Sequence, residues 1–232
     1  WRDGSVKWVL LDFQTALAAG ETKSFTLEAG GGFPPAPPPR DSIQIEEQPA
    51  ALWINTGPLR FAIPKDRSVV FASASLDVDG NGQFPAEERL PLRGLEQSLR
   101  LANEFAEWPV RVLPPEEVRV EEAGPLRAVV RLVGWMDDGG TNRLMQYRVR
   151  VQTTAGSSAV LVQHTVIQLS PRIKLLWVED LSLRLGLSLG AQATSRFGGE
   201  RGPHAGTLEG EPVTLEQLQE GGYALKRAGQ TN

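Results

Sequence analysis

Residues 143–152 read RLMQYRVRVQ, a stretch in which apolar and polar side chains alternate. One set of alternate positions is apolar and comprises Met145, Tyr147, Val149 and Val151. The set on the other side is polar and comprises Arg148, Arg150 and Gln152. Successive side chains of a β-strand point to opposite faces of a sheet. The stretch is therefore predicted to be a strand with one face against a hydrophobic core.

The same period of two recurs along most of the chain. In Leu181–Leu189, leucine occupies every second position, so this segment too is expected to place one face on a core. Further strand-like segments are Val6–Phe13, Thr22–Leu27, Ile43–Glu47, Leu59–Ile63, Val69–Val78, Val118–Val120, Leu126–Trp135 and Ala159–Leu169. Most are separated by Gly, Pro, Asn or Asp, which are turn residues. About ten strands with no helical pattern between them favour an all-β antiparallel sandwich or barrel, because parallel strands need crossover helices.

Helical patterns are few. Residues with the spacing of one helix face are Leu95, Leu99, Ala102 and Ala106. A weak capping box, Thr214 with Gln217, precedes a second short apolar pattern. The sequence predicts a short helix at each of these two places.

Two segments are predicted to lie outside the sheets. Gly30–Gly32 is followed by a proline-rich run to Pro39, which favours an extended linker because proline cannot donate to a sheet ladder. Arg196–Pro212 is rich in glycine and polar residues and is predicted to be a long surface loop.

Composition excludes several classes of protein. The chain has 232 residues, no cysteine, 24 Lys and Arg against 28 Asp and Glu, and a formal net charge of -4. That length suits one large or two small domains. The mixed charges offer no basic field for nucleic acid, and no apolar run approaches a membrane span, so neither partner is expected. The chain opens on Trp1 in strand-like sequence, and we interpret it as part of a longer protein.

The sequence of one loop matches the spacing of a calcium-binding motif. Its oxygen-bearing residues fit the spacing D-x-D-x-N-G-x5-E and are Asp77, Asp79, Asn81 and Glu88, with Gly82 at the bend. The preceding residues are strand-like rather than helical, and Pro85 interrupts the loop. The sequence therefore favours a β-turn in which Gly80, Asn81 and Gly82 supply positive φ angles, and a calcium site is the alternative. No cofactor is expected unless this loop binds calcium.

His164 is the candidate catalytic residue. It shares a strand face with Val162 and Val166, opposite Gln163 and Thr165. That position suits a buried, hydrogen-bonded core histidine, and alternatively an acid or base in the wall of a cleft. The chain's other histidine, His204, lies in the glycine-rich loop and is expected to be solvated.

Other chemistry-bearing residues are assigned structural places. Exposed tryptophans and arginines would suit sugar stacking and carboxylate binding. Core packing is nevertheless expected for the tryptophans in strand patterns, namely Trp8, Trp53, Trp135 and Trp177. Adjacent acidic pairs such as Asp137–Asp138 are expected at solvated edges and turns, because strand neighbours point to opposite faces.

Several motifs together resemble one family. The opening WRDGSVKWVLLDF is similar to the signature W-P-D-G-S-x-[KR]-W-x-L-x-D-F of the N-terminal RIFT-type barrel in exo-rhamnogalacturonan lyase-like proteins, and departs from it at Arg2. The sequences TGPLRFAI (56–63) and VEEAGPLRAVVRLVGW (120–135) resemble that family's central β-sandwich. LVQHTVIQL (161–169) resembles its v-x-H-T-f strand.

The resemblance implies a domain organisation. Residues 1–40 would be the end of the barrel with the linker, and residues 41–232 a β-sandwich, complete or in part. A polysaccharide lyase of this family also has a C-terminal α/α toroid, whose helical repeats do not occur here. Its reaction would be β-elimination beside a galacturonate, with a base, a carboxylate-neutralising group and an acid. None of its catalytic residues can be carried over, and His164 alone combines a family-like motif with suitable chemistry.

The leading expectation is a non-catalytic β-domain of a polysaccharide lyase-like protein that acts on rhamnogalacturonan-type uronate polysaccharide. The chain would belong to an enzyme if the full-length protein carries the toroid. The alternative is a structural or carbohydrate-binding module of a phage tail or cell-surface assembly. Expected partners are polysaccharide or other domains of the same assembly. An extracellular or cell-surface location is expected, with the cytoplasm still open.

Overall fold

A computed structural model describes residues 5, 8–28, 30, 42–102, 107–108, 110–140, 142–168, 177–190, 192–197, 204–207, 213–219, 222–227 and 230–231. The chain divides into two compact units, Trp1–Gly186 and Leu187–Asn232. The proline-rich run after Gly30, Ala106 and parts of the predicted loop Arg196–Pro212 lie outside the described residues.

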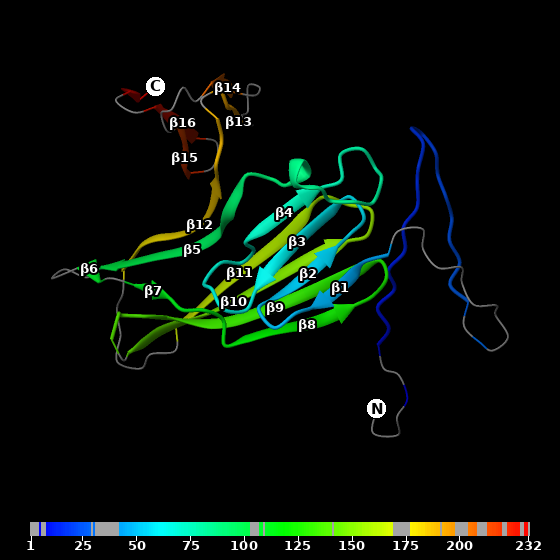
Figure 1. The fold of residues 1–232 in the computed structure, drawn as a ribbon, viewed down its shortest axis with the longest axis horizontal. Helices are drawn as coiled ribbons and strands as arrows, with labels where there is room; N and C mark the ends of the chain where they lie inside the picture. Colours follow the sequence, from blue (N-terminus) through cyan, green and yellow to red (C-terminus); the bar gives the residue numbers. More distant parts are fainter. Residues whose placement is uncertain are drawn as a thin grey trace. The chain divides into compact units, whose positions relative to one another are not determined.

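The first sheet is a four-stranded antiparallel meander in the order β1-β2-β3-β4 (Figure 1). Its strands are β1 (Gln44–Glu47), β2 (Ala51–Asn55), β3 (Leu59–Pro64) and β4 (Ser73–Leu76). Each neighbour along the chain is the neighbour in the sheet, because short turns allow only antiparallel pairing.

The second sheet is also antiparallel and has the order β11-β10-β9-β7, with β8 paired to β9. Its strands are β7 (Arg111–Val112), β8 (Glu117–Ala123), β9 (Arg127–Asp137), β10 (Arg143–Thr154) and β11 (Val160–Gln168). Val149 on β10 lies opposite Leu132 on β9 and opposite His164 on β11. The stretch 143–152 is thus the middle strand of a hydrophobic layer.

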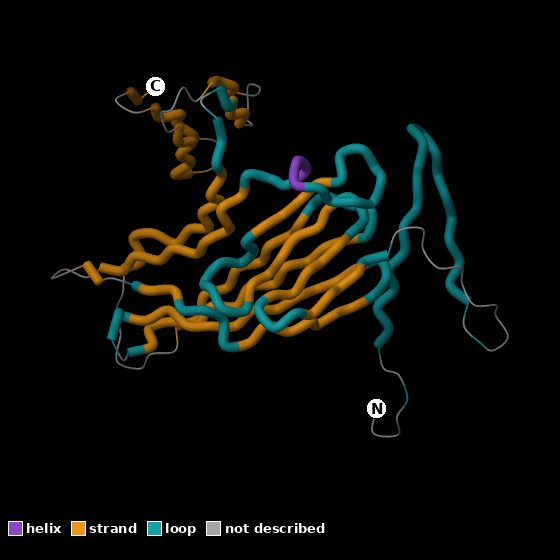
Figure 2. Tube along the Cα trace, in the orientation of Figure 1, coloured by secondary structure: helices purple, strands orange, loops and turns teal. Residues whose placement is uncertain are grey.

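Smaller sheets complete the described chain. One has the order β12-β5-β6, formed by β5 (Leu92–Ala102), β6 (Glu107–Trp108) and β12 (Trp177–Leu187). The C-terminal unit contains the pair β13 (Thr194–Phe197) and β14 (His204–Thr207), and a sheet of β15 (Val213–Gln219), β16 (Gly222–Arg227) and β17 (Gln230–Thr231). The one short coil in Figure 2 is the 3-10 helix η1 (Ala86–Glu88).

The core lies between the first two sheets, and buried leucines of β5 also belong to it. Its members from the first sheet are Leu52, Ile54, Leu59, Phe61, Ile63 and Ala74. Those from the second sheet are Val130, Leu132, Met136, Leu144, Met145, Tyr147, Val149 and Val151. In Figure 1 the ribbons of these sheets overlap as two layers. The predicted all-β antiparallel sandwich is confirmed, and its apolar face on β10 is the one that the alternation indicated.

A buried threonine connects the two sheets at one end. Thr56, in the turn between β2 and β3, has no exposed surface. Its hydroxyl donates to the Ser157 carbonyl at 2.7 Å, and Gly156 N donates to the Thr56 carbonyl at 2.7 Å. The turn itself uses Gly57 at φ +100, a conformation that favours glycine. The TGPLR motif therefore serves as a structural joint between the layers.

Both predicted helices are wrong. Leu95, Leu99 and Leu101 lie on the buried face of strand β5, and Thr214 lies in strand β15, where it pairs with Lys226 of β16. The spacing of four residues between Leu95 and Leu99 is a multiple of two, so it fits one strand face as well as one helix face. The loop predicted at Arg196–Pro212 contains the end of β13 and all of β14, which pair as a hairpin.

Two further expectations are wrong, one about the existence of strands and one about which face of a strand is buried. The described parts of Val6–Phe13 and Thr22–Leu27 form no strand, and their large apolar side chains are exposed. On β12 the leucines from Leu181 to Leu187 are exposed, while Asp180 and Ser182 on the other face are half-buried. Alternation identifies the two faces of a segment, but the neighbouring layer decides which face is covered.

Candidate functional site

His164 lies on β11 at the edge of the core. Its side chain is half-buried on the same face as Val162 and Val166, which pack against the core, as the alternation predicted. His164 Nε2 is 2.8 Å from Gln97 Oε1, a carboxamide oxygen that accepts the hydrogen bond. Gln97 is 7% exposed and lies on β5. Among the described residues, this uncharged group is the hydrogen-bond partner of the ring.

The position of Gln97 could not be read from the sequence. A polar residue between Leu95 and Leu99 on a buried strand face would have signalled a buried partner. The segment was predicted to be helical, so Gln97 was not placed on that face. The hypothesis that His164 is catalytic stays a prediction.

Burial lowers the pKa of His164 because the charged imidazolium loses hydration. The unfolded chain then binds more protons than the folded chain between the lowered pKa and the ordinary value of about 6.5. The contribution to stability is fully present above about pH 6.5 and is lost as the pH falls below it. We expect urea unfolding at about pH 5 to show lower stability than at about pH 8, and His164→Gln to reduce that difference. An unchanged difference in the variant would exclude His164 as its source.

The loop from Asp77 to Glu88 brings its carboxylates together. One carboxylate oxygen from each of Asp77, Asp79 and Glu88 lies within 4.8 Å of the others. Asp77 accepts hydrogen bonds from Gly82 N at 2.8 Å and from Asn81 N at 3.0 Å. These bonds, with that from Gly82 the strongest, lower the pKa of Asp77, so this carboxylate is charged at neutral pH.

Glu88 closes the same loop. Its Oε1 accepts a hydrogen bond from Val78 N at 2.9 Å. Its Oε2 is buried and has no hydrogen-bond partner among the described residues. Gly80 and Gly82 both adopt positive φ, as the predicted turn requires. The loop is therefore a tight turn that also collects oxygen ligands of the kind that calcium prefers.

Tryptophan was expected in the core, and the described tryptophan side chains lie elsewhere. Trp8 and Trp177 are exposed, and Trp53 and Trp135 are half-buried on the outer faces of their sheets. An arginine stacks over each half-buried indole at 4.7 Å, Arg60 over Trp53 and Arg143 over Trp135. The indole NH and an arginine stack allow tryptophan to face water while it covers the sheet.

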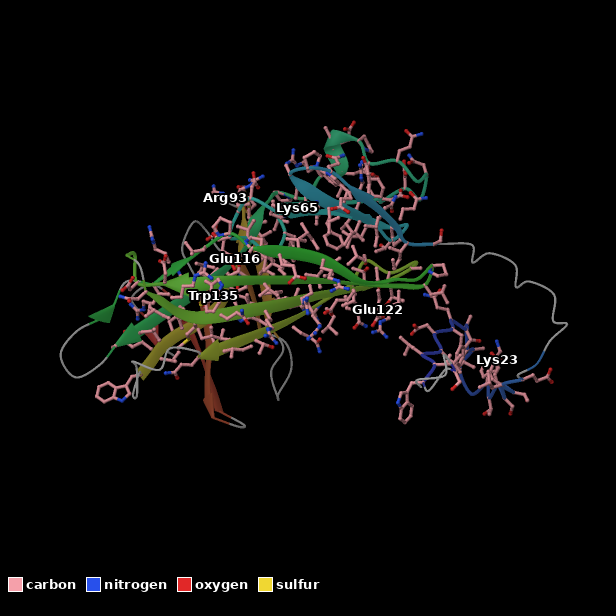
Figure 3. The ribbon with its side chains drawn as sticks, turned by 90° about the horizontal axis from the view of Figure 1, so that it is seen from below. Lys23, Lys65, Arg93, Glu116, Glu122 and Trp135 are labelled. Atoms are coloured by element: carbon pink, nitrogen blue, oxygen red, sulfur yellow. The ribbon has the colours of Figure 1, made fainter. Side chains whose placement is uncertain are left out.

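The outer face of the second sheet carries alternating charges. Glu116 accepts a hydrogen bond from Trp135 Nε1 at 3.0 Å, and Figure 3 shows the two side chains beside each other. Glu121 pairs with both Arg131, at 3.3 Å, and Arg150, at 2.6 Å. The hydrogen bond from Arg150 holds the pKa of Glu121 below its ordinary value. Arg131 and Arg150 on this face are therefore neutralised by Glu121.

Asp137 departs from the expectation for adjacent acidic residues. Asp138 does lie in a turn and accepts a hydrogen bond from Gly140 N at 2.8 Å. Asp137 is instead 5% exposed and forms a two-pronged ion pair with Arg111, with distances of 2.9 and 3.0 Å. The hydrogen bond from Arg111 lowers the pKa of Asp137, so the buried carboxylate stays charged. The pair ties β7 to β9 and is a structural feature.

The family model described as "PcRGLX-like protein central beta sandwich domain" matches residues 43–231. No curated protein is similar enough to the chain to count as a match.

Proposed function

This chain belongs to the family of PcRGLX-like central β-sandwich domains, and we propose from that membership that it is the non-catalytic sandwich of a lyase acting on rhamnogalacturonan-type uronate polysaccharide. The match to residues 43–231 carries the proposal, because it includes all of the described strands. It agrees with the resemblance of the motifs at 56–63, 120–135 and 161–169 to the same family.

The surroundings of His164 support the non-catalytic part of the proposal. β-Elimination needs a base near the acidic proton and a cation or amide that neutralises the uronate carboxylate. Among the described residues, His164 has a carboxamide partner and hydrophobic neighbours, and no arginine, lysine or carboxylate is hydrogen-bonded to its ring. A half-buried imidazole of this kind is suited to hold β11 against β5.

The substitution His164→Ala in the full-length protein tests this proposal. We expect the variant to keep forming unsaturated uronate while its melting temperature falls, because the substitution removes the bond to Gln97 and leaves that buried carboxamide unpaired. The readouts are the absorbance of the unsaturated product and thermal unfolding of the same preparation. Loss of the product with an unchanged melting temperature would make His164 catalytic and would contradict the proposal.

A second proposal concerns calcium. We propose that Asp77, Asp79, Asn81 and Glu88 hold one calcium ion, which would order the loop after β4. The convergence of three carboxylates supports it, and the buried, unpartnered Glu88 Oε2 is the observation that favours a ligand over a plain turn. Oxygen ligands in this number suit calcium, which tolerates irregular coordination.

Removal of metal is expected to lower the melting temperature of the chain by about 2–4 °C for each kcal/mol of calcium-binding free energy. Asp79→Ala should abolish the response to chelator and to added calcium. Glu87→Ala is the matched control, since Glu87 is the exposed neighbour of Glu88, and it should respond as the unmodified chain does. If chelator leaves the melting temperature of the unmodified chain unchanged, the loop is a β-turn that binds no calcium.

The rival is a structural or carbohydrate-binding module of a phage tail or cell-surface assembly. Full-length protein that binds polysaccharide and forms no unsaturated product would support that rival. No helix within the described ranges is long and apolar enough to cross a bilayer. We propose an extracellular or cell-surface location, where polysaccharide and neighbouring domains of the same protein would be the partners.

A further inference from the structure

The outer face of the β1–β4 sheet combines one large aromatic side chain with small neighbours. Trp53 on β2 lies opposite Ala62 on β3, and Ala62 lies opposite Ser73 on β4. In the adjacent row, Arg60 lies opposite Ser75. Small residues beside a tryptophan leave room above the sheet that larger side chains would fill.

Two hollows adjoin on this face and share Trp53, Arg60 and Phe84. The larger has a volume of about 450 Å³, and we call it the arginine cleft because Arg60, Arg67 and Arg89 line it. The smaller has a volume of about 260 Å³; it is lined by the amide side chains of Gln44, Asn55 and Gln83, with the Glu46 carboxylate at the same hollow, and we call it the amide-lined hollow. The arginine cleft is within the size range of small-molecule sites.

The arginines of the cleft are only weakly neutralised. Arg60 is 3.7 Å from Glu46, and Arg67 is 3.5 Å from its exposed neighbour Asp66. None of the described carboxylates pairs with Arg89. On a chain of net charge -4, three arginines around one cleft form a local positive site. The Glu121 face of the second sheet differs, because Arg131 and Arg150 there both pair with Glu121, at 3.3 and 2.6 Å.

The lining also offers contacts for a ring with hydroxyl groups. Ser73 and Ser75 supply hydroxyls on the floor of the arginine cleft, and Phe84 supplies an apolar wall. The amide-lined hollow continues these contacts with donors and acceptors that suit further hydroxyls. Guanidinium groups recognise carboxylates through paired hydrogen bonds.

We propose that the arginine cleft binds the carboxylate of one uronate unit of an acidic oligosaccharide, with the neighbouring sugar in the amide-lined hollow. The anion site is argued from the geometry alone, whereas the choice of a uronate as carrier of the carboxylate rests on the proposed function. The cleft places the sugar contact on the face opposite the core, away from His164.

Calorimetric titration of the chain with an oligogalacturonate tests the site. We expect Arg67→Gln and Arg89→Gln each to weaken binding about tenfold, and the double variant about a hundredfold. Arg148→Gln is the matched control, because Arg148 is an exposed arginine on the outer face of the other sheet, and it should bind as the unmodified chain does. These arginines are exposed, so the melting temperatures of all variants should stay unchanged.

Two further ligands test whether the cleft recognises the carboxylate of a uronate or any small anion. The methyl-esterified oligogalacturonate should bind about a hundredfold more weakly, since it lacks the charge that the arginines recognise. Inorganic phosphate should compete only at far higher concentration than the oligosaccharide. Equal binding of the ester, equal binding by the arginine variants, or phosphate that competes as well as the sugar would overturn the proposal.

The outcome is independent of the test of the proposed function. The full-length protein could form unsaturated product while the cleft variants bind as the unmodified chain does. That result would contradict the proposed binding site in the cleft and would support the lyase assignment. Conversely, the cleft variants could lose binding while the full-length protein forms no product. That result would support the binding site and contradict the lyase assignment.

Discussion

Replacing Gly134 by alanine is expected to destabilise the chain by about 1–3 kcal/mol, as overpacking of a dense core commonly does. Gly134 on β9 lies opposite Tyr147 on β10, and a Cβ at Gly134 would overlap the Tyr147 ring. Tyr147 is fully buried, and its hydroxyl donates to the Leu113 carbonyl at 2.8 Å, so the ring cannot move aside without losing that bond.

The surroundings of Tyr147 hold its ring in place over Gly134. Burial raises the pKa of its phenol, which therefore stays a hydrogen-bond donor through the physiological range. The glycine supplies the space that the ring occupies between β9 and β10. The pair is thus one unit of packing, and the two residues are expected to respond to substitution together.

Urea unfolding of a double-mutant cycle measures this coupling. In the Tyr147→Leu background, Gly134→Ala should cost little, because the overlapping ring atoms are gone. Gly190→Ala is the control, since nothing lies within 4 Å of a Cβ there and its backbone does not need glycine. Additive effects of the two substitutions would show that the ring does not lie over Gly134.

Phe61→Ala is expected to cost about 3–5 kcal/mol, the largest effect of a single substitution considered for this chain. Phe61 is 1% exposed on the inner face of β3 and meets the Phe71 ring edge to face, with ring centroids 6.2 Å apart. Removal of the ring would leave a cavity between the layers that the sheets cannot close without losing their pairing. A domain with a stability of about 5–15 kcal/mol would lose a large part of it.

Chemical unfolding of Phe61→Ala and Phe13→Ala compares the same deletion at two exposures. Phe13 is 64% exposed, so its loss should change the free energy of unfolding only slightly. Equal small effects of both substitutions would mean that β3 does not face a packed layer.

The sequence was sufficient for the strands that carry the sandwich. The alternation at 143–152 identified β10 and its buried face, because both neighbours of β10 lie in the same sheet and the core covers one side. It was insufficient for Leu92–Ala102, where a spacing of four fits both a helix and a strand. On β12 it identified two faces but not the covered one, since that depends on a layer distant in the sequence.

The candidate sites differ in the same way. The loop proposed to bind calcium is local, so residue spacing alone indicated that Asp77, Asp79 and Glu88 would lie in one turn, where their carboxylate oxygens lie within 4.8 Å of one another. The arginine cleft joins β2, β3 and the residues around η1, and the sequence holds no signal for that meeting. Alternation could place Trp53 and Arg60 on strand faces, but only the fold shows that Phe84 and Arg89 line the same hollow.

We propose that this chain holds an acidic polysaccharide and leaves its cleavage to other parts of the protein. The most direct test incubates the chain alone with rhamnogalacturonan and follows the absorbance of unsaturated uronate. We predict no increase above the protein-free control, even at concentrations where calorimetry shows bound oligosaccharide. An increase proportional to the amount of chain added would contradict the claim.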